Sequence, residues 1–279
     1  MKLRSLLFVP GDRPDRFAKA AASGADALVL DLEDAVAPAA KAEARRAVAA
    51  FLSEGPVIDC FVRINALDAD MLGPDMVAAA LAHAIMLPKC DGAAMVDHVG
   101  RMTKREQKIL PIVVETAASL FALGGYAPVA SHMCGLTWGA EDLRAAIGAA
   151  SPRLAGGRWE APFEMARSLT LFAAHANNLP AIETVYPALG DGAGLKAFAD
   201  RAARHGFTGM LALHPAQVPV INAAFTPDAA TIADARSLIQ AFEQASGSGV
   251  FAHRDRMVDA AHLAQARQIL ARAGEMGAK

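Results

Sequence analysis

Two carboxylates lie where an isolated negative charge would need a partner. Glu115 directly follows the apolar run Ile112–Val114, and Asp142 opens a predicted helix after the next apolar run. A buried carboxylate is unstable unless a cation approaches it or it takes up a proton. Two carboxylates on adjacent strand ends can bind Mg²⁺, with water completing its octahedron. The alternatives are a salt bridge for Glu115 and a favourable interaction of Asp142 with the helix dipole.

Arg63 lies within the apolar pattern Val62–Ile64 of a predicted strand. An arginine in a parallel strand must face a partner, because it cannot pack into apolar surroundings. Its planar guanidinium suits a bidentate contact with a substrate carboxylate or an enolate oxygen. Pairing with Glu33 or Asp34 is the alternative. These acids belong to the run Asp31–Asp34, which could support a metal site, contact Arg63 or cap the next helix.

Other polar residues near predicted strand ends have simpler interpretations. Lys89 is expected to form an ion pair, and His214 is expected to play a structural role in a turn. Trp138 is expected in the core, with one wall of a pocket as the alternative. The chain has three cysteines, Cys60, Cys90 and Cys134. They fit neither a disulfide framework nor a CxxC metal site, and we expect them to pack as apolar side chains.

Short apolar runs alternate with longer Ala-rich stretches of helical period, which is typical of a parallel sheet with crossover helices. Eight runs are predicted to be strands: Ser5–Val9, Ala27–Leu32, Cys60–Ile64, Ala84–Leu87, Leu110–Val114, Met133–Thr137, Ala181–Val185 and Gly209–Leu213. Eight helices are predicted with them: Pro14–Ser23, Pro38–Ser53, Pro74–Ala82, Ala93–Lys104, Thr116–Leu123, Pro162–Asn178, Gly194–His205 and Pro215–Ala223.

Eight strand–helix units in 279 residues predict an α/β fold of the (β/α)8 TIM barrel type, with a C-terminal helical extension. The active site of such a barrel lies at the carboxyl ends of the strands, where the residues above gather. An open doubly wound sheet is the alternative. It is disfavoured because no Gly-x-Gly-x-x-Gly loop follows the first strand.

A C-terminal segment follows the barrel pattern. We expect a catalytic barrel domain over residues 1–245 and a linker with a helical extension over residues 246–279. The segment Ser246–Gly249 is expected to be a flexible link, and Val258–Ala273 is predicted to be the last helix. We interpret the extension as an appendage that can reach, and complete, the active site of a neighbouring subunit.

Composition excludes several classes of protein. Hydrophobic residues make up 54% of the sequence and charged residues 20%, which permits a large core and excludes general disorder. The formal net charge of −2 gives no basic surplus for binding nucleic acid. No apolar run reaches the roughly 18 residues that span a membrane, and the N-terminal run is too short for a signal peptide. We therefore expect a reduced, cytoplasmic protein that binds neither nucleic acid nor membrane.

Seven motifs occur along the chain in a fixed order: Arg4–Gly11, Asp31–Val36, Arg63–Asn65, Leu87–Lys89, Glu115–Ala117, Gly139–Leu143 and His214–Gln217. In these motifs the sequence resembles the citrate lyase beta-subunit-like branch of the HpcH/HpaI aldolase superfamily. The resemblance runs from about Arg4 to Asp259, nearly the whole chain. Each motif alone is weak, but the ordered set is specific.

The resemblance implies a TIM barrel that binds Mg²⁺ and acts on acyl-CoA or acyl-carrier thioesters of hydroxy acids. The implied reaction cleaves a carbon–carbon bond in a 3-hydroxyacyl-CoA of citramalyl, malyl or citryl type, giving an oxo acid and acetyl-CoA. The implied ligands are therefore an acyl-CoA substrate and a small oxo acid. The implied assembly is a homotrimer, or a hexamer built from trimers.

The resemblance also implies roles for individual residues. Glu115 and Asp142 are the implied Mg²⁺ ligands, and Arg63 is implied to stabilise the enolate or the oxo-acid oxygen. Asp259 is implied to transfer a proton at the enolate carbon, and Glu33 completes the predicted catalytic set.

Ligand contacts are implied in the same way. The positions that contact CoA are matched by Phe8, Arg13 and Lys19, and the two cations suit its phosphates. The oxo-acid carboxylate is implied to meet backbone N–H groups of Gly139, Ala140 and Glu141.

Other activities on the same scaffold remain open. A malyl-CoA thioesterase-like hydrolase would use the metal and Arg63 to stabilise the thioester oxyanion while water attacks. A citrate lyase complex beta subunit would act on an acyl-carrier thioester. A CoA-independent aldolase is disfavoured by the run Leu32–Val36 and by the C-terminal extension. The sequence departs from the family at Glu183, where Asp is frequent, and at Asp255–Met257, where a Gly-Lys-Met-like pattern is common.

Overall fold

A computed structural model of the protein describes residues 2–103, 107–154, 157–244, 250–254 and 256–274. The chain forms two compact units, Met1–Ala223 and Ala224–Lys279, and each is described by itself.

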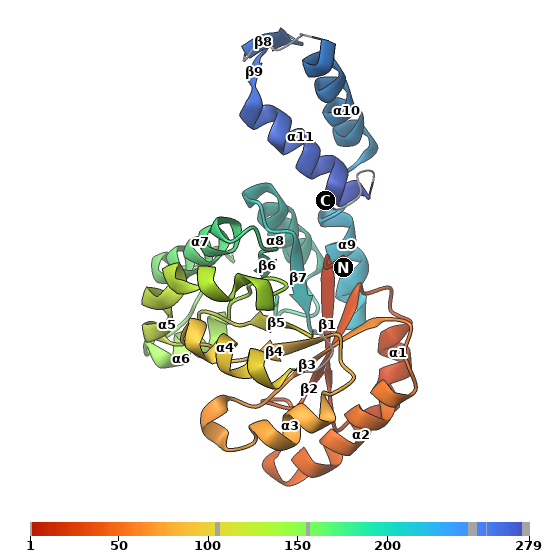
Figure 1. Ribbon diagram of the computed structural model, residues 1–279, viewed down its shortest axis with the longest axis vertical. Helices are drawn as coiled ribbons and strands as arrows, with labels where there is room; N and C mark the ends of the chain where they lie inside the picture. Colours follow the sequence, from red (N-terminus) through yellow and green to blue (C-terminus); the bar gives the residue numbers. More distant parts are fainter. Residues whose placement is uncertain (1, 104–106, 155–156, 245–249, 255, 275–279) are drawn as a thin grey trace. The chain divides into compact units, whose positions relative to one another are not determined.

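The first unit is built on a curled parallel sheet of seven strands (Figure 1). The strands are β1 Ser5–Pro10, β2 Ala27–Asp31, β3 Asp59–Arg63, β4 Ala84–Leu87, β5 Lys108–Pro111, β6 Ile182–Glu183 and β7 Gly209–Ala212. Their order across the sheet is β5-β4-β3-β2-β1-β7-β6. Strands of parallel sheets read as continuous apolar runs because both of their faces are covered, and β2 and β4 are buried at every position.

The eighth predicted strand is not continuous in the structure. The segment Met133–Thr137 forms only isolated parallel bridges, on one side to β5 and its continuation and on the other to Ala181, next to β6. Gly135 accounts for part of this difference, because glycine weakens strand interiors. It packs so closely that an added Cβ would lie 3.0 Å from the Pro180 carbonyl oxygen. The sheet therefore has seven strands where the sequence predicted eight.

Helices follow most strands, as predicted. They are α1 Phe17–Ala21, α2 Lys41–Ser53, α3 Leu72–Ala78, α4 Ala93–Met102, α5 Ala117–Ala122, α6 Ala140–Ala146, α7 Ala161–Ala176, α8 Gly192–His205 and α9 Val218–Ala224. Three predicted helices begin with a short 3₁₀ turn: Pro14–Arg16, Pro38–Ala40 and Pro215–Gln217. Proline opens each of these turns because it has no N–H to satisfy there.

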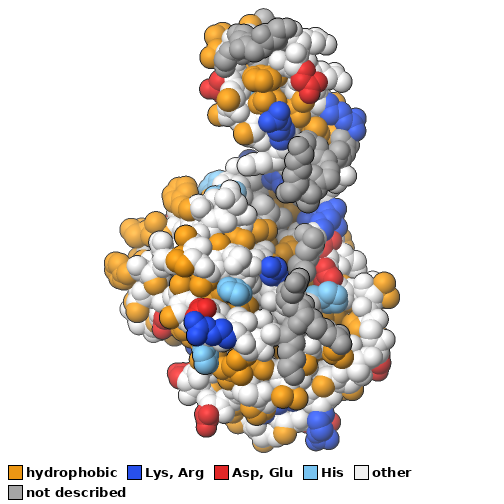
Figure 2. Space-filling view, viewed as in Figure 1, with side chains coloured by type: hydrophobic (Ala, Val, Ile, Leu, Met, Phe, Trp, Pro, Cys, Tyr) orange, Lys and Arg blue, Asp and Glu red, His pale blue; other side chains and the backbone are white. Residues whose placement is uncertain are grey.

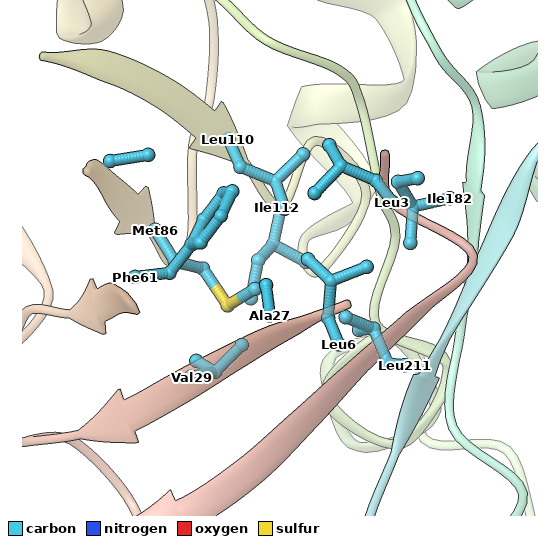
Figure 3. Packing of buried hydrophobic residues seen from close by; sticks show 11 residues of the cluster. Leu3, Leu6, Ala27, Val29, Phe61, Met86, Leu110, Ile112, Ile182 and Leu211 are labelled. Atoms are coloured by element: carbon cyan, nitrogen blue, oxygen red, sulfur yellow. The ribbon is translucent and has the colours of Figure 1, made fainter. Parts of the chain in front are cut away.

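Side chains from the strands and the segments next to them fill the inside of the curled sheet (Figure 3). Leu6 of β1 lies in register with Ala27 of β2 on one side and with Leu211 of β7 on the other. Phe61, Met86, Leu110, Ile112 and Ile182 extend this cluster around the sheet. The interior is thus a packed core, as in barrel enzymes, and polar chemistry is left to the ends of the strands.

The described part of the second unit contains two helices and a hairpin. Helix α10 spans Ala229–Gln244, strands β8 Val250–His253 and β9 Arg256–Asp259 pair antiparallel, and α11 spans Ala260–Ala273. Ala235, Ala266 and Leu270 form its small core. Helix α11 confirms the last predicted helix, whereas the sequence analysis missed α10 and the hairpin.

The link predicted at 246–249 lies outside the described residues. The predicted boundary at residue 245 falls within the second unit, after α10 rather than before it. Residue 255, part of the second departure from the family pattern, is also not described.

The hydropathy of the helices and the charge pattern of one face are as follows. Among the described residues, no helix combines the length and the apolar character that crossing a membrane requires. On the face in Figure 2, the Lys, Arg, Asp and Glu side chains of the described residues are scattered among other residues, without one continuous basic surface.

Candidate active site

A pocket of about 650 Å³ opens at the carboxyl ends of the strands. Its polar and charged lining comes from the ends of β2 and β3, from the segments around α1 and α6, and from the segments after β5, β6 and β7. These residues are Arg16, Lys19, Asp31, Arg63, Glu115, Glu141, Asp142, Thr184 and His214. Active sites of parallel barrels occupy this end, because side chains from several strands converge there.

Arg63, the last residue of β3, is held by two acids, Asp31 at the end of β2 and Glu33 just after it. Its Nε and Nη2 donate to Asp31 Oδ1 and Oδ2 at 2.7 and 2.6 Å. Its Nη1 lies 2.9 Å from Glu33 Oε2. The pairing predicted as the alternative for Arg63 is therefore present, with Glu33 and with Asp31 but not through Asp34. Burial opposes the charge, but the hydrogen bonds and charge of Asp31 raise the pKa of Arg63 above its ordinary value.

The acid run also has a local structural role. Asp31 Oδ1 accepts from the backbone N–H of Glu33 at 2.9 Å, and its Oδ2 accepts from that of Ala35 at 3.1 Å. Asp31 therefore shapes the turn and orients the guanidinium of Arg63 at the same time. Phe8 lies on the guanidinium, with its ring centre 5.0 Å from the Arg63 Cζ, which is a cation–π contact.

Lys89 joins the acids of the pocket, as predicted for an ion-pair residue. Its Nζ lies 2.5 Å from Glu33 Oε1 and 3.5 Å from Asp142 Oδ1. Its backbone N–H donates to Glu115 Oε2 at 2.5 Å. The φ of Lys89 is 47°, in the left-handed region that residues with a Cβ seldom adopt. This conformation lets one residue contact three carboxylates through its main chain and its side chain.

Glu115 is a buried carboxylate with too little positive charge around it. Its exposed fraction is 4%. Burial, against the hydrogen bond from Lys89 and together with the charge of Asp142, raises the pKa of Glu115 to about 8. Gly139 lies against it so closely that an added Cβ would be 2.6 Å from the Glu115 Cγ and 2.7 Å from its Oε1. A side chain at position 139 would therefore collide with the Glu115 carboxylate, and glycine avoids this collision.

The chemistry of these oxygens fits a magnesium ion. Asp142 is in the first turn of α6 and is partly exposed at the same pocket, with a side-chain exposed fraction of 35%. Mg²⁺ is commonly held by one or two carboxylates and keeps several waters or substrate oxygens. Within the described residues, no group of three or more His, Cys, Asp or Glu side chains is arranged to hold a metal.

A buried polar network fixes the segments that follow β2 and β3, next to the pocket. Lys41 of α2 donates to the carbonyl oxygens of Leu32 and Glu33, each at 2.7 Å, and to Asn65 Oδ1 at 2.6 Å. Asn65 in turn donates its N–H and Nδ2 to Asp75 Oδ2 at 2.7 and 2.8 Å. Three acceptors satisfy all three ammonium donors, so the carbonyl end of β2 is fixed to the segment after β3.

Most of the predicted site residues meet at this pocket. Phe8, Lys19, Arg63, Glu115, Gly139, Ala140, Glu141 and Asp142 line it. Glu33 does not line it but contacts Arg63 and Lys89. Trp138 and His214, for which we expected structural roles, line the pocket as well.

Arg13, a predicted CoA contact, does not line the pocket. Arg13 is exposed and pairs with Asp15 at 2.9 Å. Arg16, which the sequence analysis did not single out, lines the pocket with Lys19. The signal for Arg16 is its three-residue spacing from Lys19, which places the two cations on one helical face.

Asp259 belongs to the second unit, where it caps α11. Its Oδ1 accepts from the N–H groups of Ala261 and His262 at 3.0 and 3.3 Å and lies 2.8 Å from His262 Nδ1. These hydrogen bonds, with the side-chain contact to His262 the largest, lower the pKa of Asp259.

A curled parallel sheet with acids, an arginine and a lysine at its carboxyl end is an arrangement of barrel-type α/β enzymes. Residues 4–215 match the family described as HpcH/HpaI aldolase/citrate lyase, and the chain belongs to this family. This finding confirms the resemblance of the seven motifs.

Three characterised or named relatives cover almost the whole chain. A citrate lyase subunit beta-like protein of Mycobacterium tuberculosis is 38% identical over 96% of this chain and 95% of its own length. A (3S)-malyl-CoA thioesterase of Cereibacter sphaeroides is 34% identical over 99% and 96%. An L-malyl-CoA/beta-methylmalyl-CoA lyase of Rhodobacter capsulatus is 32% identical over 98% and 95%.

A solved structure extends the likeness to the fold. The crystal structure of CitE from Mycobacterium tuberculosis, in complex with magnesium, acetoacetate and coenzyme A, superposes with a TM-score of 0.82. It is 37% identical, and the alignment covers 98% of each chain.

Proposed function

We propose that this protein is a Mg²⁺-dependent carbon–carbon lyase of the TIM-barrel type. It cleaves a 3-hydroxyacyl-CoA thioester of citramalyl, malyl or citryl type to an oxo acid and acetyl-CoA. The observation that carries this proposal is the environment of Glu115, a buried carboxylate with a raised pKa that shares the pocket with Asp142 and Arg63. The magnesium, coenzyme A and acetoacetate in the CitE structure support it.

Glu115 and Asp142 would hold the metal ion. When bound, Mg²⁺ supplies a Lewis acid that polarises the oxygen at which negative charge develops. Lys89 stabilises both acids in place, one through its backbone N–H and the other through its ammonium. The ion pair with Glu33 keeps the ammonium of Lys89 beside these acids.

Arg63 would bind the oxygen on which charge accumulates as the carbon–carbon bond breaks. A guanidinium has five N–H bonds. Two of those of Arg63 donate to Asp31, and its Nη1 faces Glu33 in an ion pair. The others are available to an oxygen in the pocket that Arg63 lines. Since Asp31 and Glu33 fix its plane before substrate arrives, the stabilisation requires little reorganisation during the reaction.

The substrate would bind along the pocket from α1 to α6. Phe8, Arg13 and Lys19 contact the CoA moiety in this proposal, with Arg16 as a further cation. The oxo-acid carboxylate meets backbone N–H groups at the start of α6, around Gly139, Ala140 and Glu141. N–H groups of a first helical turn have no intrahelical acceptor and therefore suit an anion.

Cleavage requires two proton transfers. A base removes the proton of the substrate hydroxyl, the carbon–carbon bond breaks, and the thioester enolate that leaves is protonated at carbon. We assign the second transfer to Asp259, and Glu33 acts through its contact with Arg63. We further propose a homotrimer, or a hexamer of trimers, in which the C-terminal segment completes a neighbouring subunit's site.

A product assay tests the proposed reaction. Purified protein is incubated with citramalyl-CoA, malyl-CoA or citryl-CoA, each with Mg²⁺ and with EDTA, and oxo acid and acetyl-CoA are both measured. We expect equal amounts of the two products, in the presence of Mg²⁺ only, from one of the three thioesters. Absence of turnover with all three would contradict a free-standing lyase and favour an acyl-carrier substrate in a larger complex.

Thioester hydrolysis is the second candidate, because one relative is a (3S)-malyl-CoA thioesterase at 34% identity. In that reaction Arg63 would stabilise the thioester oxyanion while water attacks. Release of free CoA together with the intact hydroxy acid, without acetyl-CoA, would identify a hydrolase in the same assay.

A further inference from the structure

Glu183 is fully buried at the end of β6, with an exposed fraction of 0%, and it does not line the pocket. Its Oε2 accepts from Arg167 Nε at 2.5 Å. Its Oε1 accepts from the indole Nε1–H of Trp138 at 2.8 Å and from the backbone N–H of Thr184 at 3.0 Å. All three groups that face the carboxylate are donors, and both of its oxygens act as acceptors.

Two of these donors belong to the pocket wall. Trp138 and Thr184 both line the pocket, and they come from different segments of the chain. Trp138 directly precedes Gly139, which packs against the Glu115 carboxylate. Glu183 therefore connects two neighbouring segments of the pocket wall, one of which continues into the Gly139 backbone beside Glu115.

The indole of Trp138 is also supported from its other side. Trp159 packs edge-on against it, with ring centres 5.0 Å apart. The Arg153 guanidinium lies over Trp159 at 3.7 Å and so holds that second ring in place. The position of Trp138 is thus set by one hydrogen bond and one aromatic contact. Of these, the hydrogen bond to Glu183 fixes the rotation of the indole.

A gain in stability does not by itself explain why a carboxylate is buried at position 183. A buried ion pair such as Arg167–Glu183 loses much of its attraction to desolvation, and an apolar pair of similar volume is often as stable. An apolar residue at 183, however, would leave the indole N–H and the N–H of Thr184 without an acceptor. The carboxylate is therefore better explained by the groups it orients than by the ion pair it forms.

We propose that Glu183 is a positioning residue that fixes Trp138 and the backbone at Thr184, and so shapes the part of the pocket that receives the acyl group. The identity of the substrate in this inference rests on the proposed function. The contacts of Glu183 with the pocket wall do not depend on it. The proposal predicts that Glu183 affects recognition of the oxo acid and of the acyl moiety, and leaves Mg²⁺ and CoA binding nearly unchanged.

The test uses Glu183→Asp, which keeps the charge but is one methylene shorter and cannot reach Trp138 and Arg167 together. The chain has two tryptophans, so in a Trp159→Phe background Trp138 is the only one that emits. We expect Glu183→Asp to shift the emission of Trp138 to longer wavelength and to increase its quenching by acrylamide. Unchanged emission and quenching would overturn the proposal, whether or not the protein cleaves any thioester.

Ligand binding forms the second readout. With Mg²⁺ present, we expect the Kd for acetoacetate, and the KM of any thioester that is cleaved, to rise about tenfold in Glu183→Asp, which corresponds to about 1.4 kcal/mol. The Kd for CoA should stay unchanged. Altered emission with an unchanged Kd for acetoacetate would overturn the specificity role.

Two further variants separate positioning from loss of stability. Trp138→Phe removes the indole N–H, and its effect on acetoacetate binding should not add to that of Glu183→Asp when the two are combined. Additive effects would contradict a route through Trp138. Val99→Ala, which leaves a cavity at a buried position of α4 outside the pocket lining, should lower the Tm without changing the Kd for acetoacetate.

Discussion

The polar residues of the pocket form a chain of alternating charges in which each group fixes the next. Asp31 and Glu33 hold Arg63, Lys89 lies between Glu33 and Asp142, and the backbone of Lys89 meets Glu115. Residue types and spacing were sufficient to predict most of this cluster. They could not predict which acids would pair with Arg63, because that depends on the turn that Asp31 shapes through its own hydrogen bonds.

Removal of the Glu115 charge should weaken metal binding. We expect Glu115→Gln to lower the affinity for Mg²⁺ by more than about 100-fold, since even a residue that only orients a metal ligand can cost 10- to 100-fold. Titration calorimetry measures this affinity directly. Glu141→Gln is the matched control, because Glu141 lies in the first turn of α6 beside Asp142 but its side chain pairs with Arg144. Unchanged affinity in Glu115→Gln would exclude this residue as a ligand.

The raised pKa of Glu115 predicts a pH-dependent stability of the metal-free protein. The folded-state pKa of about 8 lies above the ordinary value of 4.5, so burial favours the protonated form. The stability that this proton contributes is fully present below about pH 4.5 and is lost as the pH rises through about 8. In EDTA, the Tm of the parent protein should therefore fall across this range relative to that of Glu115→Gln.

Each kcal/mol of this contribution corresponds to about 2–4 °C in Tm for a chain of 150–250 residues. Added Mg²⁺ should reverse the loss, because the ion stabilises the ionised carboxylate. Parallel melting curves for the two proteins at every pH would contradict the burial of an ionisable group at this position.

Among secondary-structure elements, periodicity predicted the place of almost every strand and helix of the first unit. It could not predict which apolar run would fail to form a continuous strand. The segment around Gly135 has the apolar character of a strand, yet its close contact with Pro180 limits it to single bridges. The sequence analysis missed α10 and the β8–β9 hairpin, because alternation along a short exposed hairpin is a weak signal. The site residues were predictable mainly because strand ends in a parallel sheet converge.

The buried network under the pocket makes a prediction for these elements. Lys41→Met keeps the apolar stem of the side chain but removes the three hydrogen bonds that join α2, the end of β2 and Asn65. We expect kcat to fall by about 10- to 100-fold with little change in KM, because Glu33 and Arg63 lose their fixed position.

A second lysine serves as the control for this change. Lys108→Met also removes a hydrogen bond from a lysine to a carbonyl oxygen, that of Ser131, but on the exposed surface. Its kcat should equal that of the parent protein. A Lys41→Met variant with parent kcat would show that the network supports the fold without acting on the site.

At the scale of the whole molecule, the two compact units divide the predicted catalytic residues unequally. The family match covers residues 4–215, within the first unit, and Asp259 alone of the predicted catalytic set belongs to the second. In the described structure the carboxylate of Asp259 caps α11, a role that explains its lowered pKa without any reaction. Sequence resemblance therefore assigned a role that the fold of one chain does not by itself require.

A mixing experiment distinguishes these two roles of Asp259. Asn is as good a helix N-cap as Asp, so Asp259→Asn removes the charge and keeps α11 intact. Arg63→Lys keeps a positive charge beside Asp31 and Glu33 but loses the planar fork. If each site takes Arg63 from one subunit and Asp259 from another, both variants are inactive alone. Co-expressed in equal amounts, they should recover about a quarter of the parent activity, since a quarter of the sites combine two intact residues.

The alternatives give different results in the same experiment. If Asp259 acts within its own chain, mixing restores nothing, because every site then carries one defect. If Asp259 is only a cap, Asp259→Asn keeps parent activity before any mixing. Size-exclusion chromatography of each variant confirms that the subunits still assemble, so that a lack of recovery reflects the location of Asp259 and not a loss of the oligomer.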